Sequence, residues 1–499
     1  MSQNIEKALD ALREAQKNPI TGGALSKAWT TGSGLVNYDL QRPALHLYPW
    51  GEMLTPIRNE IARVKGDGDT ATRWKAITGI NTTNLPVGLS QGNRGGVLTS
   101  TVANYTAAYV GLGIEDSVTF EADYASMEFD DVRARAVEGT LRSLMISEEK
   151  MIFGGNSTIA LGTTPTPSLT AGTTGGALSD GTFKVVCVAL THDGWTRATV
   201  AAGVVQTIVR TNADGTTDTI NGGTAQPSAI ASITISAGTA VQSVKASVTA
   251  VNGAVAYAWY IGPDTTHQYL SKITSINSTV LTATPANTYQ NAYSLVAADY
   301  SADGTYSFDG LLYQTGFGSG GSYIATQPTG TAGTGTPLTS DGAGGIVEIN
   351  TLLQSMYDNY RLSPDTAWCN SQEIINISNK VIAGGAAPLF RFNLDGQSGN
   401  LSIVAGAVVG NYLNKVTGQL VKIRVHPFCP PGTMLFTSKT LPYPQSGVST
   451  VAEIKERRSY YQIEWPLRTR KYEYGCYVDE TLAVRFLPAF AMITNIANG

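Results

Sequence analysis

Polar and apolar residues alternate through much of the chain, and helical spacing interrupts this pattern at only a few places. The longest helical stretch runs from Met127 to Phe153, with apolar residues on one face and Asp130 and Asp131 in the first turn. The helix dipole favours acidic residues there. At 1.5 Å per residue the spacing predicts a helix roughly 40 Å long, which could act as the spine of a domain.

Two segments before this helix cannot bury their apolar residues alone. Ile5, Leu9 and Leu12 form the stripe of a short amphipathic helix, so we predict that an N-terminal arm, residues 1–49, docks on another surface. Residues 50–110 alternate polar and β-forming positions around Gly- and Asn-rich stretches, which predicts a long two-stranded excursion. A two-stranded ribbon is marginally stable by itself, so this extended loop should also lie on another surface.

The middle of the chain consists of short alternating runs without a helical period. Asp193-Gly194 follows the run Phe183–Leu190 and predicts a hairpin, because an Asp-Gly pair accepts the positive φ of a tight turn. Turn signals about 8 to 12 residues apart predict an all-β sandwich within residues 165–290. The run 253–260 resembles the central strand of immunoglobulin-like modules, without that family's disulfide, and we interpret the sandwich as an inserted domain.

The last part of the chain, residues 291–499, mixes helices and strands. A low-complexity stretch, Gly316–Gly345, predicts a flexible loop. Two helical stripes follow it, and the second begins at a capping box formed by Asn370 and Glu373. The fold class is therefore α+β at both ends of the chain, with an all-β middle.

Composition and charge favour a protein that meets other protein. At 499 residues the chain should form at least two domains, and its 14% of charged residues is well below the roughly 25% of ordinary globular chains. The net charge of -4 offers no large cationic field for gripping nucleic acid or an anionic membrane. Residues 160–345 carry 5 basic and 9 acidic residues, which leaves 29 of each sign in the remainder.

Candidate chemistry is sparse, and we expect no enzymatic activity, no cofactor and no metal site. Gly88–Gly92 matches GxSxG and Gly316–Gly321 matches GxGxxG, but neither precedes the helix that such a motif needs. The turn around Asp214 resembles half of a calcium loop, and a hairpin is the favoured interpretation.

The histidines are isolated from one another, and the widely spaced cysteines indicate free thiols made in a reducing cytoplasm. These residues are His46, His192, His267, His426, Cys187, Cys369, Cys429 and Cys476.

The order of these parts resembles the major capsid proteins of tailed bacteriophages, whose shell fold is shared with encapsulins. Three strings are similar to recurrent stretches of that family, and they are Leu54–Val64, Phe308–Gln314 and Val425–Phe436. The resemblance covers about residues 1–160 and 295–499. It implies an N-terminal arm (1–49), an extended loop (50–110), a peripheral domain with the spine helix (111–164), the inserted sandwich (165–290), and an axial domain that returns to the peripheral domain (291–499).

The resemblance also implies a function and a set of partners. Such proteins assemble as hexamers and pentamers into an icosahedral shell, with portal and scaffolding proteins, around double-stranded DNA that is enclosed without sequence readout. Assembly would take place in the host cytoplasm, with no membrane partner. The candidate assembly residues are Ile5, Leu9, Leu12, Pro56, Arg58 and Arg63. Some members crosslink a loop lysine to a neighbouring subunit, and although Lys65 and Lys75 are suggestively placed, no catalytic acid can be assigned.

Two alternatives remain open on the sequence. The Gly- and Thr-rich sandwich could be a surface adhesion or binding module, in which case its deletion should abolish attachment and leave assembly intact. The chain could also be the shell protein of a bacterial nanocompartment, in which case neighbouring genes should encode a cargo enzyme rather than a portal and a terminase.

Overall fold

The computed structural model describes most of the chain from residue 53 onward. The chain divides into two units, Met1–Leu47 with Ser126–Asp130, and Tyr48–Ala125 with Asp131–Gly499, and everything below concerns the second unit. The predicted arm helix with Ile5, Leu9 and Leu12 lies outside the described residues. The described ranges are 53–66, 68–80, 86–127, 129–238, 240–318, 320–383, 392–393, 402–403, 409–444 and 446–497, with Lys7, Asp10, Arg13 and Tyr48.

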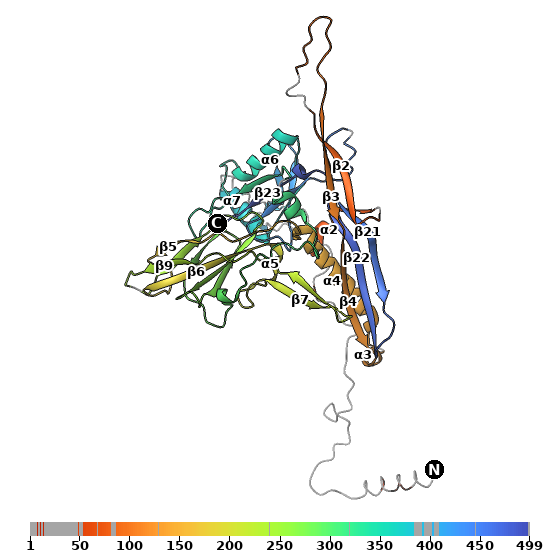
Figure 1. Ribbon diagram of the computed structural model, residues 1–499, viewed down its shortest axis with the longest axis vertical. Coiled ribbons are helices and arrows are strands. Elements are labelled where there is room, and N and C mark those ends of the chain that lie inside the picture. Colours follow the sequence, from red (N-terminus) through yellow and green to blue (C-terminus); the bar gives the residue numbers. More distant parts are fainter. Residues whose placement is uncertain are drawn as a thin grey trace. The chain divides into compact units, whose positions relative to one another are not determined.

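The predicted spine helix, α4 (Val132–Gly154), lies against a four-stranded sheet (Figure 1). It begins later than its spacing suggested because the carboxylate of Asp131 caps it, accepting a hydrogen bond from the backbone N–H of Ala134 at 3.0 Å. Leu144 on its inner face packs against Cys476 of the sheet. The strands in sheet order are β1 (Ala62–Lys65), β21 (Ala452–Glu464), β22 (Lys471–Val484) and β4 (Val110–Thr119), followed in the chain by helix α3 (Phe120–Ala125).

The predicted two-stranded excursion is present. Strands β2 (Ala71–Ile80) and β3 (Ser100–Ala108) pair antiparallel and form a two-stranded sheet of their own, which Figure 1 shows as a long projection. Trp74 stacks on Tyr105 across the pair, with ring centroids 5.6 Å apart. We call residues 71–108 the ribbon. The short helix α2 (Pro56–Glu60) and strand β1 precede it in the chain, and we call this segment, Pro56–Lys65, the base of the ribbon.

A six-stranded mixed sheet and two helices enclose the largest hydrophobic core. Helix α6 (Val347–Tyr360) places Ile349, Leu352 and Met356 in this core, as its spacing predicts. Helix α7 (Ser371–Ala383) begins after the predicted cap, Asn370. The strands in sheet order are β14 (Tyr323–Thr326), β23 (Phe490–Thr494), β20 (Met434–Thr437), β15 (Thr366–Cys369), β19 (Leu420–Val425) and β18 (Asn411–Leu413). The short elements nearby are η5 (Leu487–Ala489), β16 (Phe392–Asn393) and β17 (Ser402–Ile403). The structure thus confirms the α+β class.

The middle of the chain forms two sheets and a separate hairpin. Residues from both sheets, among them Val244 and Trp259, share one buried cluster, and the opposite face of the second sheet, around Tyr260, is buried as well. This double burial explains why every residue of β11 is buried. The immunoglobulin-like character of this segment stays a prediction. The first sheet is β13 (Ser278–Leu281), β10 (Ser243–Ser247) and β5 (Ser168–Gly172), and the second is β12 (Tyr269–Thr274), β11 (Ala256–Gly262), β6 (Gly181–Leu190) and β9 (Ala231–Ile235). The hairpin is β7 (Thr207–Thr211) with β8 (Thr217–Asn221), and η3 (Ala292–Ser294) comes near the end of the segment.

Two predictions for loops and turns were wrong. Asp193-Gly194 lies inside a short helix, α5 (His192–Arg197), because the hydroxyl of Thr191 caps it and accepts from the backbone N–H of Gly194. The low-complexity stretch after Gly316 contains strand β14 and begins in a π-helix, η4 (Leu312–Gly316). Helix α5 is set by this local cap, which the Asp-Gly turn signal outweighed in the prediction, whereas β14 is set by pairing with the distant strand β23.

Polar contacts fasten the middle segment to the end of the chain. The side chain of Asn277 donates to the carbonyl of Val248 at 2.7 Å and to the hydroxyl of Thr329 at 2.8 Å. Its backbone N–H donates to Asn495 Oδ1 at 3.0 Å, and Asn495 Nδ2 donates back to Asn277 Oδ1 at 3.1 Å. Asn277 is buried, so water does not compete for these bonds in the folded chain.

We therefore expect Asn277→Ala to lower the free energy of unfolding by about 1 to 3 kcal/mol, because it leaves buried donors and acceptors unpaired. Denaturant unfolding of the full chain measures this change. Asn359→Ala is the matched control, since Asn359 is exposed and bonds only within its own helix. A loss no larger than that of the control would contradict the fastening role.

Candidate assembly site

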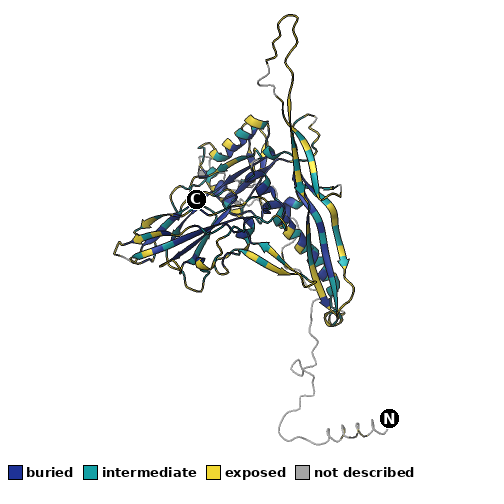
Figure 2. Cartoon of the chain, viewed as in Figure 1, coloured by how far each residue is buried: buried dark blue, intermediate teal, exposed yellow. Residues whose placement is uncertain are grey.

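The ribbon carries apolar side chains that face solvent. Val87 and Val97 in its loop are 88% and 82% exposed, and Figure 2 shows exposed positions along its length. Burying a valine completely is worth about 1.5 to 3 kcal/mol, so this surface gains stability when another surface covers it. We call the exposed set the ribbon patch, and it comprises Ile77, Ile80, Val87, Leu89, Val97, Leu98 and Val102.

The base of the ribbon is anchored on the spine helix through Glu149. Pro56 occupies the first turn of α2, and its ring is buried. The next two backbone N–H groups, of Ile57 and Arg58, donate to the Glu149 carboxylate at 2.9 and 2.7 Å. This carboxylate at the start of α2 satisfies donors that the helix itself leaves unpaired. His426 Nε2 lies 2.8 Å from the same carboxylate, and burial lowers the pKa of that imidazole.

Arg58 and Arg63 enter a network of acidic side chains beside this anchor. Arg58 Nε donates to Glu148 at 3.0 Å, and Arg63 Nη2 donates to the other oxygen of the same carboxylate. Arg63 Nη1 also donates to Glu456 and, at 3.1 Å, to Glu480. Both guanidinium groups lie against the ring of Tyr460, 5.3 and 5.2 Å from its centroid. We call Arg58, Arg63, Glu148, Glu456, Tyr460 and Glu480 the arginine–glutamate cluster.

The cluster is buried unevenly. The side chains of Glu148 and Glu480 are fully buried, whereas Arg63 retains 23% exposure. Glu480 Oε1 has no hydrogen-bond partner among the described residues. Burial, with a further contribution from the charge of Glu456, raises the pKa of Glu480 to about 7, against the opposing effect of Arg63.

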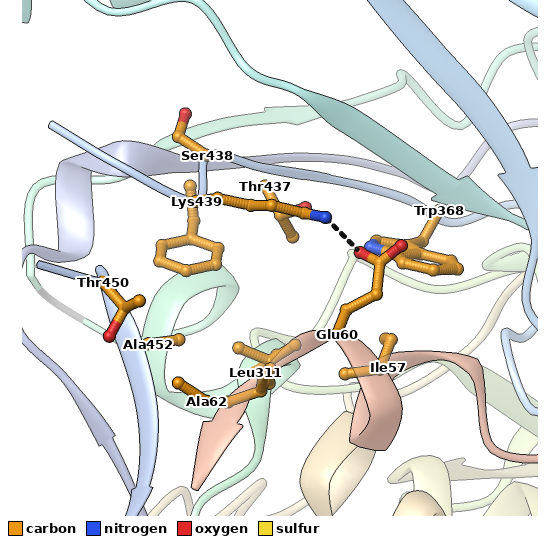
Figure 3. A pocket seen from close by; sticks show the side chains of 12 residues that line it. Ile57, Glu60, Ala62, Leu311, Trp368, Thr437, Ser438, Lys439, Thr450 and Ala452 are labelled. Carbon is orange, nitrogen blue, oxygen red and sulfur yellow. Dashed lines mark ion pairs between the residues drawn. The ribbon is translucent and has the colours of Figure 1, made fainter. Parts of the chain in front are cut away.

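A small cavity lies beside α2 (Figure 3). Its volume is about 100 Å³, and apolar side chains that include Ile57, Leu311 and Trp368 line it. Glu60 lies at this cavity, where its carboxylate pairs with Lys439 at 3.3 Å and with Arg424. The segment from Pro56 to Arg63 is therefore held both by the cluster and by the ion pairs of Glu60.

The candidate assembly residues differ in how far the structure describes them. Pro56, Arg58 and Arg63 all belong to the base of the ribbon, and the two arginines are engaged with partners inside the chain. Their role in assembly stays a prediction, and the contacts show how they could act by positioning the ribbon. Ile5, Leu9 and Leu12 lie outside the described residues.

The histidines are less isolated than the sequence suggested. The rings of His192 and His426 both pack on Phe153, with centroids 5.6 and 4.3 Å from it. His192 Nε2 lies 2.7 Å from the carbonyl of Phe428, and burial lowers the pKa of His192 to about 4. These rings fill space where the middle segment meets the core. Among the described residues no group of acidic, histidine and cysteine side chains has the arrangement of a metal site.

The remaining motifs form ordinary structure. Gly88–Gly92 lies in the exposed loop of the ribbon, and Gly316–Gly321 leads into strand β14. The turn around Asp214 joins β7 to β8, as the hairpin interpretation predicted. All four cysteines are free and buried. In the described part of the chain, no helix is long and apolar enough to span a membrane.

The sequence interpretation missed the acidic half of the cluster. Glu148 and Glu149 lie on the buried side of α4, together with Leu144 and Ile152. Acidic residues at helical spacing from buried apolar residues are a usable signal, because a buried carboxylate needs a partner. The partners could not be identified, since they are distant in the chain. Arg58 and Arg63 lie 90 and 85 residues before Glu148, and Tyr460 lies 312 residues after it.

Comparison with known proteins returned only structural neighbours. No family model and no curated protein matches the chain. The chain is similar to the capsid of Myoviridae phage XM1 at 9% identity and a TM-score of 0.41, covering 91% of this chain and 95% of that one. It is similar to the capsid of the native GTA particle at 7% identity and a TM-score of 0.42, covering 96% of this chain and 100% of that one. It is also similar to the SrpI encapsulin of Synechococcus elongatus PCC 7942 at 9% identity and a TM-score of 0.36, covering 91% of this chain and 92% of that one.

Proposed function

We propose that this chain is a major capsid protein, whose copies assemble into an icosahedral shell that encloses a phage genome. The observation that carries the proposal is the ribbon, a two-stranded projection with an exposed apolar patch and a firmly anchored base. A single chain gains nothing from such a projection. In a closed assembly, every copy can cover the ribbon patch of a neighbour, and the same contact is repeated by symmetry.

The proposed occupant of the ribbon patch is a second copy of the same chain. The order of parts along the sequence supports this choice, because the resemblance to phage capsid proteins includes the string that leads into the ribbon. The anchoring of Pro56 to Arg63 also supports it, since a fixed base directs the projection along one line. Hexamers and pentamers are the assemblies we expect.

The enclosed partner in this proposal is double-stranded DNA that is contained without being read. The net charge of -4 is consistent with this role, because a sequence reader depends on a basic surface that grips phosphates. Portal and scaffolding proteins are the further partners we propose, together with assembly in the host cytoplasm. The protein then acts through its interfaces, and we propose no catalytic role for it.

Expression of the full chain, with scaffolding protein where it is needed, tests the proposal. We expect sedimentation to show large closed particles in place of a single small species. A chain that stays a monodisperse monomer over a wide range of concentration and salt would overturn the proposed function.

A further inference from the structure

Two acidic residues face each other in the sheet beside the ribbon base. Glu456 of β21 and Glu480 of β22 are direct cross-strand partners. Like charges in this position destabilise a sheet unless a positive charge compensates them. Arg63 of β1 supplies that charge, because its Nη1 donates to both carboxylates. Among the described strands β1 pairs only with β21, so Arg63 supplies contacts that hold it to the rest of the sheet.

The charges in the arginine–glutamate cluster do not balance. Its three carboxylates exceed its two guanidinium groups by one negative charge. Tyr460 is neutral near pH 7, as tyrosines ordinarily are, and burial raises the pKa of its hydroxyl further. A buried excess charge is costly, and binding one proton removes it. Glu480 accepts from Arg63 of β1 and lies opposite Glu456 of β21 and the uncharged Val110 of β4. Arg58 of α2 and Tyr460 of β21 are close enough to interact with it electrostatically, and Glu148 of α4 shares Arg63 with it.

Glu480 is the carboxyl group best placed to take that proton. Glu148 accepts from two arginines and a tyrosine, and Glu456 is partly exposed. Glu480 is fully buried, and one of its two oxygens accepts nothing among the described residues. Its raised pKa, about 7, agrees with this placement.

We propose that the arginine–glutamate cluster is a proton-operated latch on the base of the ribbon. With a proton on Glu480 the cluster is neutral, and the hydrogen bonds of Arg63 hold β1 against β21 and β22. Loss of that proton to water leaves the cluster with a net negative charge, which loosens β1 and the ribbon that follows it. The latch goes beyond the proposed function, because it is a property of the single chain and can be tested whether or not shells form.

The direction of the pH effect follows from the pKa of Glu480. In the folded chain it lies near 7, above the ordinary value of 4.5, so the folded state binds more protons than the unfolded state between these two values. The stabilisation of the folded chain by protonated Glu480 is therefore fully present below about pH 4.5. It decreases as the pH rises towards 7, and above pH 7 the free energy of unfolding no longer changes with the titration of this group. The opening equilibrium of β1 should change by up to about 10-fold per pH unit within that window.

Hydrogen–deuterium exchange of the β1 amides in the full chain tests the latch. Each exchange rate between about pH 5 and pH 8.5 is divided by the intrinsic rate at that pH, so that only structural opening remains. We expect the protection of Ala62–Lys65 to fall towards pH 7 in the native chain and to be independent of pH in Glu480→Gln. Glu473→Gln should behave like the native chain, because Glu473 lies on the same strand but pairs with Lys471 instead.

A second measurement does not depend on the folding of the variant. Isotope-edited infrared spectroscopy of the native chain, with labelled glutamate, should detect the band of a protonated buried carboxyl group at pH 6 and its loss by about pH 8.5. Absence of that band at pH 6 would overturn the proposal. So would pH-independent protection of β1 in the native chain, or equal effects of the two substitutions.

Discussion

Replacing Val87 and Val97 together by aspartate will abolish particle formation and leave the fold of the single chain intact. Both side chains are almost fully exposed in the single chain, so the substitution removes little that stabilises it. In an assembly each copy loses the burial of two valines, about 3 kcal/mol or more, and places two carboxylates in an apolar contact. This loss alone raises the dissociation constant of each contact between copies at least ~100-fold.

The measurement is sedimentation across a concentration series, with thermal unfolding of the unassembled chain beside it. The control replaces two other exposed valines, Val209 in the β7–β8 hairpin and Val241, by aspartate. We expect the control to assemble. Normal particles from the ribbon variant at the native concentration would show that the ribbon patch is not an interface, and loss of assembly in both variants would show that added charge alone prevents it.

Arg63→Ala should be among the most destabilising single substitutions in the chain, at about 3 to 5 kcal/mol near neutral pH. It leaves the fully buried carboxylates of Glu148 and Glu480 without their shared partner, and an uncompensated buried charge is costly. Denaturant unfolding of the full chain measures the loss. Arg73→Ala is the control, because its pair with Asp69 is exposed and solvent screens such pairs, so the loss should be small.

The same comparison separates two roles for Arg63. If it positions the ribbon base, as its internal contacts indicate, stability and assembly will fall together. If Arg63→Ala assembled poorly but lost less than about 1 kcal/mol, its main contact would be with another copy, and the description of the cluster as an internal anchor would be wrong.

The sequence predicted best what depends on local periodicity. Helix α4 was visible because its apolar spacing continues for more than 20 residues and Asp131 lies where a cap is needed. The ribbon was visible because β2 and β3 alternate and lie close together in the chain. In both cases the residues that decide the structure are near one another in sequence.

The parts that could not be predicted depend on distant contacts. Strand β1 pairs in parallel with β21, so that Ala62 faces Glu453, a separation of nearly 400 residues that no local pattern encodes. In the low-complexity stretch after Gly316, a Cβ on Gly320 would collide with the side chain of Leu487, so the chain packs closely against a distant segment there. Glycine at this position allows two segments to approach closely, although the composition of the stretch resembles that of a flexible loop.

The most direct test of the central claim is a reconstruction by electron microscopy of the particles formed by the full chain. The account predicts a closed icosahedral shell in which the ribbon of each copy lies across a neighbouring copy and its apolar patch is covered. A chain that forms no particles, or a shell in which the ribbons project freely into solvent, would contradict it.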